Sequence, residues 1–212
     1  MARYTKALCR LCRREGIKLF LKGQRCLTEK CACSTSRRPY IPGMHHDSPR
    51  RKLSEYGKQL REKQKAKRIY GIFERQFRRY FAIANRLPGE TGENLLRLLE
   101  TRLDNVVYEG GFALSRRQAR FFVTHGKVLV NGKRINIPSY QVKPGERISL
   151  SESISNNENV LKAISEAQKK KATPSWFEVN YDKKEILIKN QPSRTDISVP
   201  IQEQLIVELY SK

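Results

Sequence analysis

The chain has 212 residues, enough for one large or two modest domains, and a formal net charge of +22 at pH 7. Hydrophobic residues make up 38% of the chain and fall in patterned runs, which favours a folded protein over a disordered one. The sequence has no apolar run long enough to span a membrane and no signal-peptide core near its start, so we expect a cytoplasmic protein.

The positive charge is concentrated in the first 151 residues, which hold the whole excess. The remaining 61 residues contain nine basic and nine acidic side chains and are therefore neutral. A basic surface of this strength attracts polyanions, above all nucleic acid. We therefore expect nucleic acid to lie along the first 151 residues, while the neutral segment faces solvent, the protein core or another protein.

Residues 1–47 read as a turn-rich arm that contains few apolar side chains to bury and therefore needs a staple. All five cysteines of the chain lie in this arm. Two close pairs, Cys9-x2-Cys12 and Cys26-x4-Cys31, are separated by 13 residues, a spacing that favours a tetrahedral zinc site. The cytoplasm keeps thiols reduced, which argues against disulfide bonds.

We therefore expect one structural zinc ion, with Cys9, Cys12, Cys26 and Cys31 as its ligands. Cys33 could replace Cys31 as the fourth ligand, and the histidines His45 and His46 are a further substitute pair. An iron–sulfur cluster and the absence of any metal are the remaining alternatives. A thioredoxin-like role is disfavoured because the cysteines lack a βαβ context.

Three helical patterns follow the arm. Residues 53–70 form a polar pattern with basic side chains around much of its circumference, after a Ser48-Pro49 pair that suits a helix start. Residues 74–87 place aromatic side chains on one face and arginines largely on another, and residues 93–108 repeat this amphipathic pattern with leucines and valines. The apolar stripes predict a helical core.

An α-then-β module is expected next. Ser115 suits the cap of a short helix that Gly126 closes. Asn131-Gly132 lies between two alternating runs and is the strongest short hairpin signal, because both residues tolerate positive φ. Gly145, after a proline, suits a type II turn that leads into another strand.

The last third of the chain continues this mixed pattern. Residues 156–171 read as a helix and "WFEVNYDKKEILIK" as a second hairpin, whereas "IQEQLIVELY" fits either a strand or a helix. The sequence contains no GxxxxGK[ST], HExxH or GxSxG motif. We therefore expect neither a catalytic site nor a small-molecule substrate.

The segment "SRRQARFFVTHGKVLVNGKRI" carries the clearest nucleic-acid signal, because its basic side chains project from a helix and a hairpin, while we expect Phe121 and Val123 to face inward. Guanidinium groups match phosphate oxygens geometrically. Neither a helix-turn-helix nor an RRM pattern of aromatic residues accompanies them, which favours recognition of folded RNA through shape and backbone. The predicted RNA-binding residues are Arg3, Arg10, Arg13, Arg14, Lys22, Arg50, Lys52, Arg61, Lys65, Arg68, Arg78, Arg116, Arg117, Arg120, Lys127, Lys133 and Arg134.

Several blocks of the sequence carry a resemblance to a known family. "SRRQARFFVTHGKVLVNGKRINIPSY" resembles the small RNA-binding module of the S4 family. "CRLCRREGIKLFLKGQRC", "REKQKAKRIYGIFERQFRRYF", "LLRLLETRLDNVVYEGGFALSRRQAR" and the closing "PIQEQLIVELYS" resemble the bacterial S4 family of small-subunit ribosomal proteins. The cysteines match its four-cysteine zinc-binding subtype, to which Cys33 is an addition. The resemblance covers essentially the whole chain.

The resemblance implies an α+β fold with a zinc-stapled N-terminal arm, a mostly helical domain and an inserted α/β RNA-binding module. We place the arm at residues 1–47 and the helical domain at residues 48–103, completed by residues 197–212. The module, with its hairpin extension, then occupies residues 104–196.

The resemblance also implies a function that is structural and not enzymatic. Members of the family bind small-subunit ribosomal RNA at a multi-helix junction in the 5′ domain, nucleate assembly and support translational accuracy. The implied partners are this RNA, neighbouring ribosomal proteins, notably S5, and, for some members, their own messenger RNA. The alternatives are a fragment of an RNA-modifying enzyme or a synthetase that carries the same module, and a messenger-binding translational repressor.

Overall fold

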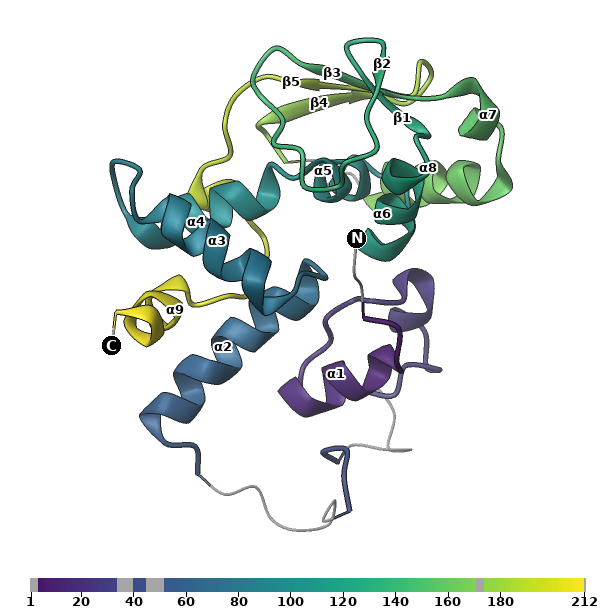
Figure 1. Cartoon of the computed structure of the whole chain (residues 1–212). Helices are drawn as coiled ribbons and strands as arrows, with labels where there is room; N and C mark the ends of the chain where they lie inside the picture. Colours follow the sequence, from purple (N-terminus) through teal and green to yellow (C-terminus); the bar gives the residue numbers. More distant parts are fainter. Residues whose placement is uncertain (1–3, 34–39, 45–51, 171–173, 212) are drawn as a thin grey trace. The chain divides into compact units, whose positions relative to one another are not determined.

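The computed structural model of the chain describes residues 4–33, 40–44, 52–170 and 174–211 (Figure 1). The chain forms two compact units, Met1–Ala82 with Pro200–Lys212 and Ile83–Val199. The first unit is helical in its described part, and the second combines helices with an antiparallel sheet. The expected α+β fold is therefore confirmed. No described helix is both long enough and apolar enough to cross a membrane.

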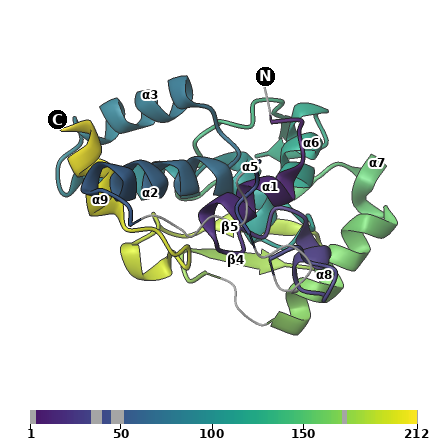
Figure 2. The same ribbon diagram turned by 90° about the horizontal axis from the view of Figure 1, so that it is seen from below.

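The first unit is built from helices at both ends of the sequence. Its helices are α1 (Leu8–Glu15), the short 3-10 helix η1 (Gly23–Cys26), α2 (Glu55–Ile69), α3 (Glu74–Ala84, which ends just past the division between the units) and α9 (Glu203–Tyr210). Figures 1 and 2 show α9 beside α2, and the two helices pack together. The segment "IQEQLIVELY", whose pattern fitted either a strand or a helix, therefore contains a helix.

Helix α2 begins because Ser54 caps it: the Ser54 Oγ accepts a hydrogen bond from the backbone N–H of Gly57 at 3.1 Å. The helix start expected at Ser48-Pro49 lies outside the described residues. Around α2, the core of the unit buries the side chains of Ile69, Phe77 and Ile206. The stacked rings of Phe77 and Tyr210, with centroids 6.2 Å apart, hold α9 to α3.

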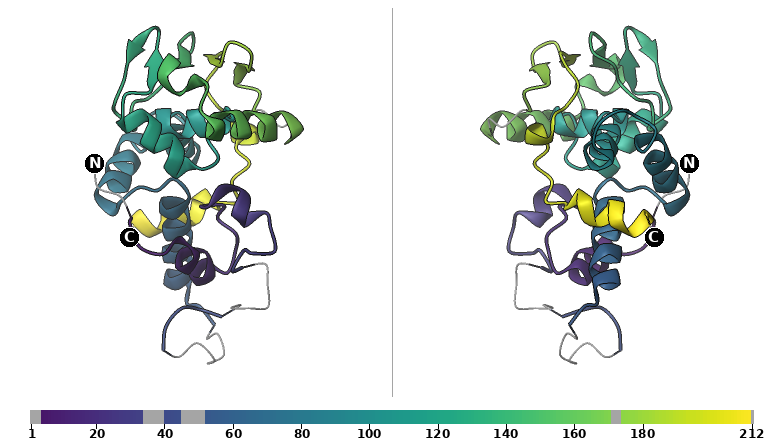
Figure 3. Two further views of the ribbon diagram at one scale, coloured as in Figure 1. Left: turned by 90° about the vertical axis from the view of Figure 1, so that its right-hand side faces the viewer. Right: turned by 90° about the vertical axis from the view of Figure 1, so that its left-hand side faces the viewer.

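The second unit contains a five-stranded antiparallel sheet with helices on one face (Figures 1 and 3). Its strands follow the order β2-β1-β3-β5-β4. In chain order its elements are α4 (Thr91–Glu100), α5 (Leu103–Glu109), α6 (Arg116–Thr124), β1 (Val128–Val130), β2 (Lys133–Arg134), β3 (Arg147–Leu150), α7 (Glu152–Ser155), α8 (Glu158–Lys170), β4 (Phe177–Asn180), β5 (Glu185–Ile188) and the 3-10 helix η2 (Arg194–Asp196).

The local sequence signals of this unit have the expected consequences. Asn131 and Gly132 adopt φ values of 49° and 79° and connect β1 to β2, so the first hairpin is confirmed. Strands β4 and β5 form the second hairpin. One face of the sheet buries alternate side chains, including Ile148 and Ile186, in a core that Phe112 and helical residues complete.

The single helix expected over residues 93–108 is wrong, because the chain breaks into α4 and α5 at Thr101 and Arg102. The Thr101 carbonyl accepts from the Val142 N–H at 2.9 Å, and the Leu103 N–H donates to the Tyr140 carbonyl at 2.9 Å. These bonds form an isolated β-bridge that straightens the chain between the two helices. Tertiary hydrogen bonds therefore override the helical pattern.

The compact units also divide the chain differently from the expected domains. The division lies between Ala82 and Ile83, so α4 belongs to the second unit, where it packs near η2 and Arg97 Nε donates to the Pro192 carbonyl at 3.4 Å. The return to the first unit at Pro200 lies near the expected residue 197. The boundary between residues 103 and 104 stays a prediction.

Candidate nucleic-acid interface

Helix α6 carries three of the predicted RNA-binding arginines, and the fold gives them different roles. The Ser115 Oγ accepts from the Gln118 N–H at 3.3 Å, so the expected cap is confirmed and α6 begins at Arg116. Arg117 points to solvent. The side chains of Arg116 and Arg120 are only 15% and 11% exposed.

Arg116 and Arg120 tie α6 to α5 through ion pairs. Arg116 Nη2 lies 2.6 Å from Glu109 Oε1, and Arg116 Nε donates to Asn105 Oδ1 at 2.7 Å. Arg120 Nη1 lies 3.5 Å from Asp104 Oδ2. Because their charges are largely compensated inside the protein, these two arginines orient α6, and Arg117 is the one of the three whose side chain is exposed.

A buried ion pair that sequence reasoning missed supports this arrangement. Arg102 is fully buried, and its guanidinium makes two bonds to the Asp104 carboxylate, Nε to Oδ1 at 3.0 Å and Nη2 to Oδ2 at 2.7 Å. The signal available in the sequence was a pair of opposite charges two residues apart within an apolar run. Whether such a pair is buried depends on which residues, distant in sequence, pack around it. The sequence therefore did not identify it.

The hairpin that follows α6 adds a second basic surface. Lys133 and Arg134 lie on β2, the edge strand, and both are exposed. Lys127 is half-buried, and its Nζ donates to the Ser153 Oγ at 3.0 Å. Asn131 fixes the hairpin tip, because its Oδ1 accepts from the Arg147 N–H at 2.9 Å. Lys133 and Arg134 therefore project from a rigid turn, which suits contact with a phosphate backbone.

Basic residues of α2 are mostly engaged within the first unit. Arg61 and Arg68 both pair with Glu15 at the end of α1, whose side chain is only 3% exposed. Lys65 Nζ lies 2.6 Å from Glu62 Oε1 and donates to the Pro200 carbonyl at 3.0 Å. The three predicted RNA-binding residues of α2 thus also connect α2 to the arm and to the segment before α9.

A further cluster of charges joins α2, α3 and α9. Lys63 Nζ and Lys67 Nζ lie 2.8 Å and 2.6 Å from the Glu74 carboxylate, which also accepts from the Tyr210 hydroxyl at 2.9 Å. Burial alone would raise the pKa of Glu74, but these hydrogen bonds lower it to about 2. Glu74 is therefore ionised at neutral pH and holds the three helices together.

Helix α3 presents an exposed arginine face instead. Arg75, Arg78 and Arg79 are all exposed. The side chain of Arg78 is 71% exposed and lies 3.6 Å from Glu74, so this pair contributes little. Of these three arginines, only Arg78 is among the predicted RNA-binding residues. Arg75 and Arg79 share the polar face of the helical pattern, and this spacing could have added both to the predicted RNA-binding residues.

Four of the predicted RNA-binding residues of the arm lie on described segments. Arg10, Arg14 and Lys22 are exposed, and Arg13 is half-buried with its guanidinium carbon 5.8 Å from the centroid of the Tyr40 ring. Lys52, just before α2, is exposed. The predicted residues Arg3 and Arg50 lie outside the described residues.

The five cysteines of the arm are all free thiols. Cys12, Cys26 and Cys31 are buried, whereas Cys9 and Cys33 are partly exposed. Burial raises the pKa of Cys12 to about 11, and the neighbouring thiols of Cys33, Cys26 and Cys9 act in the same direction. The backbone N–H of Lys22 donates to Cys26 Sγ at 3.4 Å.

The donor chemistry of the arm fits a zinc ion, but the described side chains do not form a ligand set. Among the described residues, no three His, Cys, Asp or Glu side chains form a group that could hold a metal ion. The alternatives His45 and His46 lie outside the described residues. Metal binding is coupled to the folding of its site, because the ion itself brings its ligands together, and the four-cysteine site stays a prediction.

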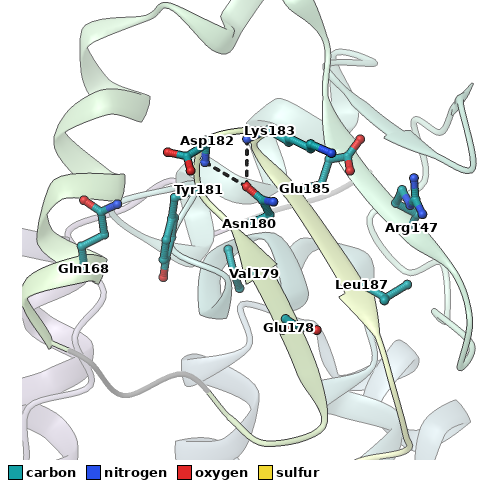
Figure 4. Close-up of a pocket in the computed structure, with 10 residues that line it drawn as sticks. All are labelled: Arg147, Gln168, Glu178, Val179, Asn180, Tyr181, Asp182, Lys183, Glu185 and Leu187. Carbon is teal, nitrogen blue, oxygen red and sulfur yellow. Dashed lines mark hydrogen bonds between the residues drawn. The ribbon is translucent and has the colours of Figure 1, made fainter.

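A surface hollow of about 510 Å³ lies on the β4–β5 hairpin, next to Arg147 of β3 and Gln168 of α8 (Figure 4). Asn180 Oδ1 closes the hairpin turn by accepting from the N–H groups of Asp182 and Lys183 at 3.1 and 3.0 Å. The described residues that line the hollow include no serine, cysteine or histidine. These lining residues therefore do not form the pair of a serine or cysteine nucleophile with a histidine base.

Comparison with known proteins finds two consecutive family models along the chain. Residues 3–100 match the family model "Ribosomal protein S4/S9 N-terminal domain", and residues 101–148 match the "S4 domain". Small ribosomal subunit protein uS4A of Clostridium acetobutylicum and that of Alkaliphilus oremlandii are each 58% identical to the chain over 212 residues. Small ribosomal subunit protein uS4 of Natranaerobius thermophilus is 54% identical over 214 residues.

These similarities extend from end to end, because each alignment covers 100% of this chain and 100% of the relative. The two matched models follow one another in the order in which the helical segment and the α6–β1–β2 segment occur here. The chain therefore belongs to the uS4 family of small-subunit ribosomal proteins.

Proposed function

We propose that this chain, as a small-subunit ribosomal protein, binds a multi-helix junction in the 5′ domain of the ribosomal RNA and nucleates assembly there. The observation that carries the proposal is the division of its basic residues into two classes. Arg61, Arg68, Arg116 and Arg120 fix helices to one another through ion pairs. Exposed residues on the same or adjoining helices, such as Arg117, are thereby held ready to contact phosphate.

This arrangement suits a place where RNA helices converge. Closely spaced phosphates repel one another, and basic side chains that are fixed in position offset that repulsion without a large loss of conformational entropy. Each unit presents exposed basic residues of its own: Arg75, Arg78 and Arg79 on α3 in the first unit, and Arg117, Lys133 and Arg134 on α6 and β2 in the second. Basic side chains that are fixed on a folded unit select an RNA by the spacing of its phosphates, so they recognise shape and not base sequence.

The direct test is binding to a fragment of small-subunit ribosomal RNA that contains the junction, compared with a simple duplex of the same length. We expect tight binding to the junction that weakens steeply with salt, and weaker binding to the duplex. Arg117→Ala should weaken junction binding and reduce the slope of log K against log salt by about 1. Equal affinity for both RNAs would contradict the proposal.

The finer partners belong to the same proposal. The neutral segment from residue 152 onward suits contact with a protein, and we propose the neighbouring ribosomal protein S5 as one such partner, with support of translational accuracy as the consequence. Repression of the chain's own messenger would use the same basic surface. Co-sedimentation with small subunits through a high-salt wash separates ribosome assembly from messenger repression or an RNA-modifying activity as the main role.

A structural zinc ion in the arm is a separate proposal. Cys9, Cys12, Cys26 and Cys31 supply four thiols, and three of them are buried in a segment with few apolar side chains. Zinc bound as a tetrahedral thiolate complex would fix the arm, and the exposed Arg10 and Arg14 with it. Elemental analysis of protein purified without chelator should find one zinc per chain; a metal-free protein would remove the proposal and leave the RNA-binding one intact.

A further inference from the structure

Helix α6 of the second unit buries its other apolar side chains but exposes one aromatic ring, that of Phe121. Phe121 of α6 is 49% exposed, whereas the adjacent Phe122 is 6% exposed and belongs to the core. Among the residues of α6, all of which are described, Phe121 is the one large apolar side chain that is exposed. Packing within the unit therefore does not explain why a phenyl ring stands at this position.

Phe121 is part of a row along one face of α6. Arg117 lies one helical turn before it and His125 one turn after it, so the three side chains share a face. The centroids of the Phe121 and His125 rings are 4.1 Å apart with an interplanar angle of 50°. Phe121 also meets Phe122 edge-on, with centroids 6.4 Å apart. Two neighbours thus hold the Phe121 ring in place while half of it stays open to solvent.

The charge beside this row is positive. Arg117 is exposed at one end of the row, and the half-buried Lys127 follows two residues after His125. The acidic side chains of α5, the helix that packs against α6, are Asp104 and Glu109, and they are engaged by Arg120 and Arg116. An anionic ligand that approaches Phe121 therefore meets the exposed Arg117, while the α5 carboxylates are compensated.

We infer that Phe121 and His125 form a stacking platform for one unpaired base of the bound RNA, with Arg117 on the adjoining phosphate. Unpaired bases in loops and junctions stack on aromatic side chains, whereas paired bases are unavailable to them. A single ring between basic groups suits a nucleotide better than a protein, because a protein partner would favour a contiguous apolar patch. The inference rests on the proposed RNA-binding function and adds a specific nucleotide contact to it.

The test uses the full-length protein and the junction RNA fragment, with 2-aminopurine placed in turn at each unpaired position. We expect quenching of the fluorophore at one position on binding. Phe121→Ala should abolish that quenching and weaken affinity about 5- to 150-fold, the range observed when an aromatic residue that stacks on a base is replaced by alanine. Phe121→Tyr, which keeps the ring, should retain both the quenching and the affinity.

Matched variants separate the stacking contact from the electrostatic one. Phe121→Ala removes no charge, so its salt slope should equal that of the unmodified protein, whereas Arg117→Ala should lower the slope by about 1. Leu161→Ala removes another exposed apolar side chain, 48% exposed on α8, and should leave RNA affinity unchanged. Thermal unfolding of each variant checks that the fold is intact.

The outcomes distinguish the two proposals. Wild-type affinity of Phe121→Ala, together with weakened binding by Arg117→Ala, would overturn the stacking platform and leave the RNA-binding function standing. Unchanged RNA affinity of Phe121→Ala with impaired incorporation into small subunits would also overturn it and would indicate a protein partner at this face. Failure of the unmodified protein to prefer the junction RNA would overturn the proposed function itself.

Discussion

The arm at residues 4–33 and the module around the five-stranded sheet are both basic, but they hold their shapes by different means. The module buries a continuous apolar cluster in which Val106, Phe112 and Ile148 have no exposed surface. In the arm, Leu19 and three cysteines are the buried apolar side chains. Apolar burial contributes about 25 cal/mol per Å², so a segment with so few buried groups needs other contacts. The difference shows that two basic segments can differ in how many buried apolar contacts hold them in shape.

The largest effect should come from breaking the buried ion pair of the module. Asp104→Ala removes both bonds to the fully buried Arg102 guanidinium and the contact with Arg120. An uncompensated buried charge is costly, so we expect the free energy of unfolding of the second unit to fall by about 3–5 kcal/mol. Denaturant unfolding measures the loss. A decrease of less than about 1 kcal/mol in the free energy of unfolding would mean that the Arg102–Asp104 pair does not stabilise the packing of α6.

A smaller loss should follow from overfilling the same core. A Cβ at Gly110 would lie 2.3 Å from Ile186 Cδ1, and Ile186 is fully buried. Gly110→Ala should therefore cost about 1–3 kcal/mol, the usual penalty for overpacking. Gly57→Ala is the milder comparison, because its Cβ would lie 3.3 Å from Ser54 Oγ, a tight contact with an exposed side chain that can shift by a few tenths of an ångström. That variant should change stability by less than about 1 kcal/mol in thermal or denaturant unfolding.

Replacing cysteines should loosen the arm without changing the stability of the module, because different contacts hold the two regions in shape. Cys9→Ser with Cys12→Ser should make the arm sensitive to limited proteolysis, because the arm has few other buried groups to hold it. The thermal transition of the second unit should stay unchanged. Cys31→Ser and Cys33→Ser, compared singly, identify the fourth ligand: whichever releases zinc and loosens the arm completes the site. Unchanged proteolysis in every variant would show that the thiols do not stabilise the arm.

The smallest expected effect concerns the Glu74 cluster that joins α2, α3 and α9. Its pKa is lowered from 4.5 to about 2, so the unfolded chain takes up its proton at higher pH than the folded protein. The stability it contributes is therefore present above about pH 4.5 and is lost as the pH falls toward 2. Glu74→Gln should cost about 1 kcal/mol at pH 7, since the side chain is 34% exposed and solvent weakens the pairs.

The test of this cluster is a pair of stability curves against pH. The curve of Glu74→Gln should approach that of the unmodified protein between pH 4.5 and 2, because protonation removes the same charge. Curves that stay parallel across this range would contradict the assignment. The thermal transition of the first unit is the quantity to follow, since α9 belongs to that unit.

Local signals in the sequence were reliable where the residue itself restricts the backbone. Asn131-Gly132 specified the first hairpin because both residues tolerate positive φ, and Ser115 specified the start of α6 because its hydroxyl satisfies a backbone N–H. The pattern over residues 93–108 was unreliable at one point. The bonds from Thr101 and Leu103 to a segment nearly 40 residues away interrupt the helix, and no local signal encodes such a contact.

The candidate site was predicted less completely than the fold, and for a related reason. Composition identified the basic part of the chain, residues 1–151, and hence the class of partner. It did not separate arginines that contact carboxylates within the protein from those that face solvent. Arg116 and Arg117 are neighbours in the sequence with the same chemistry, yet only the first meets Glu109. The expectation that Phe121 and Val123 face inward is correct for Val123 and wrong for Phe121, whose ring is exposed in a helix whose other large apolar side chains are buried.

The sequence by itself determined the total charge and its confinement to the first 151 residues, the hairpins, the helix cap at Ser115 and the resemblance to a ribosomal family, because these depend on residue types and short spacings. Only the tertiary structure decided which basic side chains form ion pairs within the protein and where the helical pattern of residues 93–108 breaks. It also decided that the closing segment is a helix beside α2. Those features depend on contacts between residues distant in sequence. Such contacts arise from packing and desolvation, which local patterns do not encode.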